Sequence, residues 1–416
     1  MEKQINIPQL RFPDFTGEWE VKKLGEVADF KVTNSFSREN LNYESGTVKN
    51  IHYGDIHTKF QTLFDITKEK VPFINEEMNI GRIINDFYCR EGDIVFADAS
   101  EDLNDVGKSI EIINLNNEKL LSGLHTLLAR PQNGYFQKGF NGYLFKSNNV
   151  RLQIKKEAQG SKVLSVNVGR ISNINISFPS LPEQQKIATF LTATDDKLQA
   201  LKKKKALLEQ YKKGVMQKLF SQKLRFKDEN GGDFPEWEAK KGNDVFVPIS
   251  NKEHNSDLPI LAISQEHGAI PRDLIEYRIS VTSKSIKSYK VVDVGDFIIS
   301  LRSFQGGIEY SNYKGICSPA YIILRSKIEI NNNFYKFYLK TGNYIQLLNK
   351  KLEGIRDGKM ISYKYFSDID LPYPSINEQS KIATFLSTLD EKINQVAEQI
   401  AQTATWKKGL LQKMFI

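Results

Sequence analysis

The stretch that decides the fold is P-E-Q-Q-K-I-A-T-F-L, Pro182 to Leu191, which returns as N-E-Q-S-K-I-A-T-F-L at Asn377 to Leu386. Aligned without a gap, residues 181–220 and 376–415 are identical at 17 of 40 positions. Self-similarity at a fixed spacing indicates that the protein is a tandem of two homologous halves.

Each repeat predicts one long helix. Ser180 with Glu183, and Ser375 with Glu378, give the S-x-x-E pattern of a capping box at the same point of both copies. Beyond the cap, apolar residues recur with heptad spacing over about five heptads, which is typical of a coiled-coil seam. The seam residues expected to pack helix against helix are Ile187, Leu191, Leu198, Leu201, Ile382, Leu386, Leu389, Ile393 and Val396.

The direction of this packing follows from lengths. A helix of about 39 residues is ~58 Å long, whereas the region of about 150 residues between the helices has a radius of gyration of only ~15 Å as a compact domain. Such a domain joins neighbouring helix ends more easily than distant ones. The helices are therefore expected to run antiparallel, with one globular module at each end and approximate two-fold symmetry between the halves.

The two modules share a scaffold but differ in their loops. Both open with a matching entry, E-W-E-V-K-K from Glu18 and E-W-E-A-K-K from Glu236, and both carry a later turn and strand, E-G-D-I-V-F from Glu91 and V-G-D-F-I-I from Val294. The distance from Trp to the turn glycine is 73 residues in the first half and 58 in the second. Unequal loops on a common scaffold are expected when two related modules recognise different targets.

β-rich runs broken by Gly and Asn predict a mixed α/β class for each module. These runs are residues 127–130, 174–178, 321–324 and 369–371. The predicted domains are residues 1–176 for the first module, 177–221 for the first helix, 222–371 for the second module and 372–416 for the second helix.

Composition narrows the class of partner. Net charge is +8 and the pI is near 9.0, which favours a polyanion such as nucleic acid. No run approaches the ~20 apolar residues of a membrane span, and the first residues lack the layout of a secretion signal. With only Cys89 and Cys317, at non-equivalent places, a disulfide or thiolate metal site is not expected, so the sequence predicts a cytoplasmic protein without a membrane partner.

Motifs for catalysis are missing from the sequence. V-G-K-S at residues 106–109 lacks the glycine that opens a phosphate-binding loop, because Asp102 stands at that position. His52 and His57 are five residues apart and fit loop side chains better than a zinc site. No nucleophile elbow and no N-P-P-Y-type motif of DNA methyltransferases is present. The sequence predicts a protein that is not an enzyme, with no catalytic residue, cofactor or metal of its own.

The duplicated E-Q-x-K-I-A helix, the two Trp-entered modules and the missing catalytic motifs closely resemble the specificity subunit of type I restriction-modification systems. Residues 183–188 and 378–383 carry the resemblance, which covers essentially the whole chain; Asn377 departs from the pattern where the first copy has Pro182. The resemblance implies that each module is a target-recognition domain for one half of a bipartite site on double-stranded DNA. It also implies that two methyltransferase subunits and then restriction subunits join the complex, and that S-adenosylmethionine, Mg and ATP bind only to those partners.

The helix pair then predicts a spacer. A length of ~58 Å corresponds to roughly 17 base pairs, so two modules could contact half-sites about one helical turn apart. Polar loops are expected to contact the DNA, and R-S-F-Q-G-G is favoured because it follows a predicted strand and has two glycines for close approach. The expected DNA-contacting residues are Thr33, Ser35, Arg38, Asp98, Lys108, Ser109 and Lys162 in the first module, and Arg302, Ser303, Gln305, Arg356 and Lys359 in the second.

Two other functions stay open. A stand-alone restriction or modification enzyme would need a cofactor or metal motif, and a coiled-coil scaffold would need no nucleic acid. The basic run at residues 202–205 fits a solvated face or a partner contact better than a phosphate clamp, because its counterpart at residues 397–400 carries no positive charge.

Overall fold

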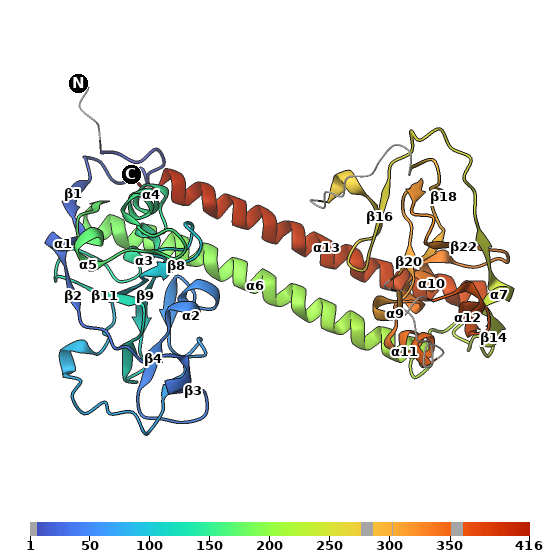
Figure 1. Cartoon of the computed structure of the whole chain (residues 1–416), viewed down its shortest axis with the longest axis horizontal. Helices are drawn as coiled ribbons and strands as arrows, with labels where there is room; N and C mark the ends of the chain where they lie inside the picture. Colours follow the sequence, from blue (N-terminus) through green and yellow to red (C-terminus); the bar gives the residue numbers. More distant parts are fainter. Residues whose placement is uncertain (1–5, 276–285, 302, 351–360) are drawn as a thin grey trace. The chain divides into compact units, whose positions relative to one another are not determined.

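The computed structural model describes residues 6–275, 286–301, 303–350 and 361–416 (Figure 1). The chain divides into two compact units, residues 1–202 with 398–416 and residues 203–397. Each unit holds an α/β module together with part of two long helices, α6 (Leu181–Phe220) and α13 (Ile376–Lys413).

The first unit is built on a five-stranded sheet in the order β2-β11-β7-β9-β5. Its strands are β2 (Ala28–Lys31), β11 (Thr126–Pro131), β7 (Ile94–Ala97), β9 (Ser109–Asn114) and β5 (Leu63–Asp65). All neighbours are antiparallel except β5, which pairs in parallel with β9. A second sheet, β10-β4-β6-β3, comprises Leu120–Ser122, Lys49–Ile51, Phe73–Ile74 and Leu41–Asn42.

Short elements complete this unit. Two small antiparallel pairs join β1 (Glu20–Lys23) to β13 (Asn175–Phe178) and β8 (Ala99–Ser100) to β12 (Leu164–Ser165). The helices are α1 (Leu24–Val27), α2 (Tyr53–Thr58), α3 (Phe140–Leu144), α4 (Asn148–Glu157) and α5 (Val168–Ile171).

The second unit repeats the central sheet with four strands in the order β15-β22-β19-β20. They span Phe246–Ile249, Ile322–Ser326, Phe297–Ile299 and Glu309–Tyr310. Three antiparallel pairs surround it: β14 (Glu238–Lys241) with β23 (Asp370–Tyr373), β16 (Leu261–Ser264) with β17 (Gly268–Pro271), and β18 (Lys290–Val292) with β21 (Gly315–Cys317). Its helices are α7 (Gly242–Val245), α9 (Ser303–Gly306), α10 (Asn332–Tyr338), α11 (Gly342–Lys350) and α12 (Tyr363–Ser367).

The long helices are part of both hydrophobic cores. In the first unit, Ile187 and Leu191 from the start of α6 share a core with Leu410 at the end of α13. Met414 and Phe415, which follow this helix, belong to the same core. In the second unit, the end of α6 and the start of α13 meet in the same way. There the shared core contains Val215, Leu219, Ile382, Leu386 and Leu389. The two helices therefore run antiparallel within each unit, as the heptad pattern and chain lengths predicted.

The mixed α/β class and the internal repeat are confirmed. Every run assigned to a strand from its sequence overlaps one, although residues 174, 321 and 369 lie just before the strands, and the two turn glycines, Gly92 and Gly295, have φ of +92° and +97°. An L side chain is strained in this region, which explains why both copies use glycine there.

The predicted capping box is wrong in one detail. Both helices begin directly after Ser180 and Ser375, but Glu183 and Glu378 do not turn back to the cap. Each carboxylate instead accepts hydrogen bonds from an arginine of its own unit, Arg11 or Arg225. A guanidinium offers two donors and a full positive charge, whereas the cap offers one backbone N–H.

Candidate nucleic-acid interface

A buried ion pair attaches each module to its long helix. Arg11 donates from Nε and an Nη to the two oxygens of Glu183 at 2.8 and 2.7 Å, and Arg225 does the same to Glu378 at 3.1 and 2.9 Å. The carboxylates are 1% and 0% exposed. In the second unit the indole N–H of Trp237 adds a third bond to Glu378 at 2.9 Å. The glutamate of the repeated motif is therefore a structural anchor.

The next residue of the motif makes a second attachment. Gln184 accepts from the backbone N–H of Gln137 at 2.9 Å, and its equivalent Gln379 accepts from the backbone N–H of Asn331 at 2.8 Å. Both amides also donate to the carbonyl of the proline that ends the preceding strand region, Pro179 or Pro374. The Glu-Gln pair thus fixes the start of each helix to its module, and both copies of the repeat make equivalent contacts.

Repeated ion pairs lie along the helix seam. Lys407 of α13 pairs with Asp195 of α6 in the first unit, and Lys212 of α6 pairs with Asp390 of α13 in the second. Each of these lysines also lies over an aromatic ring of its module, Tyr143 at 5.7 Å or Phe337 at 4.8 Å.

Burial along the seam follows the heptad. Ile187, Leu191, Ile382, Leu386, Leu389, Ile393 and Val396 are buried, and Leu198 and Leu201 are half-buried. The basic run at residues 202–205 is exposed at its first three positions, and Lys205 is half-buried.

A polar surface of the first module surrounds α2. Arg38 makes a bidentate pair with the buried Asp55 at 2.8 and 2.9 Å, while its own side chain stays 43% exposed. Lys108 donates to the carbonyl of His57 at 2.6 Å. Although burial raises the pKa of Asp55, hydrogen bonds from Arg38 and Lys59 outweigh it and lower that pKa. The pair therefore stays charged at neutral pH and holds the guanidinium in place.

Aromatic and histidine rings gather on the same surface. The ring of Tyr53 lies 4.6 Å from His52, 6.0 Å from His57 and 5.4 Å from His125. His125 occupies the tight turn between β10 and β11 with φ of +55°, which is uncommon for a residue with a side chain. Its Nδ1 lies 3.3 Å from a carboxylate oxygen of Asp98. Burial raises the pKa of Asp98, and the nearby His125 reduces this rise without cancelling it.

Thr33 contacts the residue that follows the same turn. Thr33 donates to the carbonyl of Thr126, and Gly123 lies so close to Asn50 that a Cβ there would be 2.4 Å from the amide nitrogen. Guanidinium, imidazole, carboxylate and ammonium groups of this kind recognise base edges and phosphates. Among the described residues no group of His, Cys, Asp and Glu could hold a metal ion.

The structure brings together part of the predicted contact set. Arg38, Asp98 and Lys108 surround α2. Lys162 is exposed in the loop before β12, and β12 pairs with β8. The carbonyl of Ala99 in β8 lies within hydrogen-bond distance of Nε2 of His57, which connects this loop to α2. Ser35 is exposed as well. Ser109 does not fit, because it lies inside β9 and is 2% exposed.

In the second module, residues 303–306 of the R-S-F-Q-G-G segment form α9. Gln305 is exposed, whereas Ser303 is 1% exposed and its hydroxyl accepts from the Ser300 N–H at 2.8 Å, so it has a structural role. Arg302, Arg356 and Lys359 lie outside the described residues.

The group of tyrosine and histidine rings on this surface was not predicted from the sequence. Tyr53, His57 and His125 were not among the expected contacts, and His52 and His57 were assigned to a loop. His57 lies in α2, and His52 caps that helix by accepting from the Gly54 N–H at 3.1 Å. The run H-Y-G-D-I-H contained the signal, since two histidines and a tyrosine lie on one short segment. His125 comes from a turn more than 60 residues away and had no local signal.

Comparison with known proteins places the chain in a family. A family model described as type I restriction modification DNA specificity domain matches residues 16–210 and again residues 226–404. The putative type I restriction enzyme MjaX specificity subunit of Methanocaldococcus jannaschii is 26% identical over 434 residues, covering 98% of this chain and 95% of that protein. The MjaVIII specificity subunit of the same organism is 26% identical over 288 residues, covering 65% and 68%.

Two solved structures share the fold. The S subunit of a type I restriction-modification system from M. genitalium aligns with a TM-score of 0.57 and 15% identity over 99% of both chains. A chain from a structure concerned with complex assembly and conformational transition of the type I R-M system aligns with a TM-score of 0.55 and 18% identity, covering 94% and 96%. No helix among the described residues is both long and apolar enough to cross a membrane. Because the family model matches both halves, the chain belongs to the family of type I restriction-modification DNA specificity proteins.

Proposed function

We propose that this chain selects a bipartite, asymmetric site on double-stranded DNA for a type I restriction-modification complex, with one module for each half-site. Family membership makes it a specificity subunit rather than a catalytic one. The observation that carries the proposal is the duplicated attachment, Glu183 with Arg11 and Glu378 with Arg225, which holds two modules with different loops on equivalent helix starts. The proposed module boundaries are residues 1–176 and 222–371, with the helical segments at 177–221 and 372–416.

The proposed contacts of the first module are centred on α2. Arg38 supports the assignment best, because Asp55 binds the Nη1 and Nη2 donors and orients the guanidinium, which stays accessible. The remaining edge, Nε with the second hydrogen of Nη2, is the pair of donors that would match the two acceptors of guanine. Tyr53, His57 and His125 extend the surface with rings, and Asp98, Lys108, Lys162, Thr33 and Ser35 complete it. In the second module we assign contact to Gln305 and to its neighbour Arg302.

The long helices have two proposed roles. Their 40 and 38 residues give lengths of ~60 Å, which would set the spacer between half-sites. Their solvent-facing residues, including the exposed lysines at 202–204, are proposed to dock two methyltransferase subunits, which restriction subunits then join. S-adenosylmethionine, Mg and ATP are assigned to those partners, and the cytoplasm is the proposed compartment.

The test is reconstitution with the cognate methyltransferase subunit and mapping of methylated positions. We expect methylation at a two-part motif with a fixed spacer. Exchanging residues 1–176 for the corresponding module of a relative should change one half of that motif and leave the other unaltered. Methylation without a bipartite motif, or a change in both halves, would contradict the proposal. Binding that ignores DNA sequence altogether would favour the scaffold function.

A further inference from the structure

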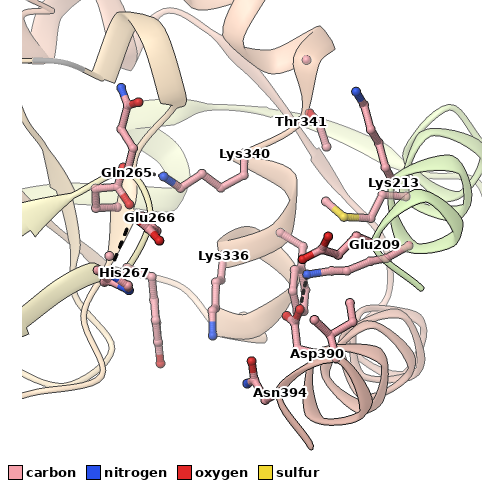
Figure 2. A pocket seen from close by; sticks show the side chains of 18 of the residues that line it. Glu209, Lys213, Gln265, Glu266, His267, Lys336, Lys340, Thr341, Asp390 and Asn394 are labelled. Carbon is pink, nitrogen blue, oxygen red and sulfur yellow. Dashed lines mark hydrogen bonds and ion pairs between the residues drawn. The ribbon is translucent and has the colours of Figure 1, made fainter. Parts of the chain in front are cut away.

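The second unit contains a cleft of about 810 Å³ between its module and the long helices (Figure 2). It is lined by the last turns of α6, by residues 390–394 of α13, by the turn between β16 and β17, by the edge strand β20, and by α10. Lys336 of α10 projects into this space between His267 and Asn394 in Figure 2.

Ion pairs neutralise most of the charged groups in the cleft. Lys212 pairs with Asp390, Lys340 with Glu309, and Glu209 with Lys205 on the same helix. Glu266 lies 3.7 Å from His267. Within the described part of the chain, Lys336 and Lys213 have neither a hydrogen bond nor an ion pair. The lining as a whole carries four lysines and four carboxylates, so its charge balances overall, but the ammonium of Lys336 has no anionic partner of its own.

Lys336 is held ready for an anion. Its Nζ lies 5.4 Å from the ring centre of Tyr310 and 5.8 Å from that of Phe337, which positions the ammonium without using its hydrogen-bond donors. Burial lowers the pKa of Lys336, and the nearby Asp390 opposes this effect. An unpaired, partly desolvated ammonium costs stability, which an anionic ligand would relieve.

The first unit fills the equivalent place with its own chain. The segment F-N-G-Y-L-F-K at 140–146 corresponds to F-Y-K-F-Y-L-K at 334–340, so Gly142 stands where the second module has Lys336. A Cβ on Gly142 would lie 2.7 Å from the Leu63 side chain and 3.1 Å from the Thr62 carbonyl. Lys146, the equivalent of Lys340, donates to the Thr62 hydroxyl, and Gln61 accepts from Gln199 of α6. The open cleft and its lysine are therefore specific to the second module.

The cleft borders the segment assigned to DNA contact. Gln265 lines the cleft, and its side chain is so close to Gly306 of α9 that a Cβ there would lie 2.6 Å away. Gln305, which is exposed on α9, is the neighbour of Gly306 in the chain and therefore lies next to the cleft. A cation beside a base-reading segment is where proteins contact the DNA backbone to fix the register of the reading residues.

We propose that this cleft binds a phosphate group of the DNA backbone beside the second half-site, with Lys336 as the principal cation and His267 at its rim. The inference rests on the proposed function and adds that the second module makes a contact with the DNA backbone that the first module lacks. The ligand chemistry is that of a phosphate group, and the position next to α9 favours DNA over a free nucleotide.

The test measures DNA affinity of the complex with its methyltransferase over a series of salt concentrations, using a duplex that carries the mapped site. Lys336→Gln should lower the slope of log K against log salt by about 0.9, the value for one phosphate contact, and weaken binding about eightfold at 0.1 M salt. The preference among DNA sequences should stay the same. Lys336→Arg keeps the charge and should restore the slope.

Lys364→Gln is the matched control, because Lys364 is exposed on α12 of the same unit and does not line the cleft. It should leave slope and affinity unchanged. In the wild-type complex, replacing single phosphates by neutral methylphosphonates should weaken binding at one position beside the second half-site, and Lys336→Gln should abolish that sensitivity.

Separate outcomes overturn the two proposals. If the wild-type complex shows no preference for the mapped site, the proposed function fails. If it shows that preference but Lys336→Gln keeps the wild-type slope, only the phosphate cleft is refuted. ATP and inorganic phosphate serve as probes without DNA: binding that Lys336→Gln abolishes, with an unchanged DNA slope, would assign the cleft to a soluble phosphate ligand and overturn the DNA assignment.

Discussion

Replacing Arg225 by Met removes the guanidinium that holds Glu378. The carboxylate is 0% exposed and would retain only the indole N–H of Trp237, a neutral donor at 2.9 Å. Removing one partner of a buried ion pair costs ~3–5 kcal/mol, and the remaining bond places this case near ~3 kcal/mol. For a unit of about 200 residues that loss lowers Tm by roughly 6–12 °C.

The first unit provides an internal comparison. Glu183 has no bond from Trp19, whose indole nitrogen is buried without a hydrogen-bond partner in the described part of the chain. Arg11→Met should therefore cost more than Arg225→Met, at ~4–5 kcal/mol. Thermal unfolding measures the stability lost in each variant. Hydrogen exchange, followed separately over residues 1–202 and 203–397, assigns that loss to the first or the second unit.

Two further variants define the outcome. The double variant Arg225→Met with Glu378→Met should recover most of the stability, because apolar residues of similar size can replace a buried ion pair at little cost. Arg90→Met removes a 57% exposed arginine and should cost less than ~0.5 kcal/mol. A Tm of Arg225→Met within about 2 °C of wild type, below the smallest change expected from the size scaling, would refute the anchoring role.

Two other substitutions test the helix seam and its edge. Burial lowers the pKa of Lys146 from 10.5 to about 8, so its charge opposes folding below pH 8 and this cost disappears as pH rises towards 10.5. Lys146→Met should stabilise the protein by ~2 kcal/mol at pH 7, after loss of the Thr62 bond, and should destabilise it by less than ~1 kcal/mol near pH 10.5, where only the loss of that bond remains; urea unfolding at both pH values with an equal gain would contradict this. Val396→Asp buries a carboxylate at a position that is 4% exposed and should cost several kcal/mol in thermal unfolding, whereas Leu207→Asp, at 54% exposure, should be near neutral; equal effects would argue against the seam.

Local patterns in the sequence predicted the elements that local physics determines. The heptad placed Ile187 and Leu386 in the seam because burial on a helix repeats with the helical period. The Gly-Asp turns at Gly92 and Gly295 predicted β7 and β19 because a positive φ selects glycine. Helix ends, strands and antiparallel packing followed from such rules together with chain length.

Contacts between distant segments were not accessible in the same way. Arg11 meets Glu183 across 172 residues, and Arg225 meets Glu378 across 153. An S-x-x-E pattern alone predicts that the glutamate accepts from the backbone at the helix start, because the neighbouring sequence gives no sign that a distant arginine will bind it. The same limit applies to His125 beside Tyr53 and to the burial of Ser109 and Ser303, since polarity predicts exposure only on average.

The hydrogen bonds of Gln184 and Gln379 have a consequence for how such proteins diversify. On the module side, the donor is a backbone amide, of Gln137 or Asn331, and every amino acid except proline supplies one. A foreign module can therefore be joined to the helix whatever side chains it carries at that point. Recombination could therefore exchange modules as cassettes provided that the incoming module supplies an arginine for the glutamate of the motif, because the glutamine contact requires only the shape of the main chain.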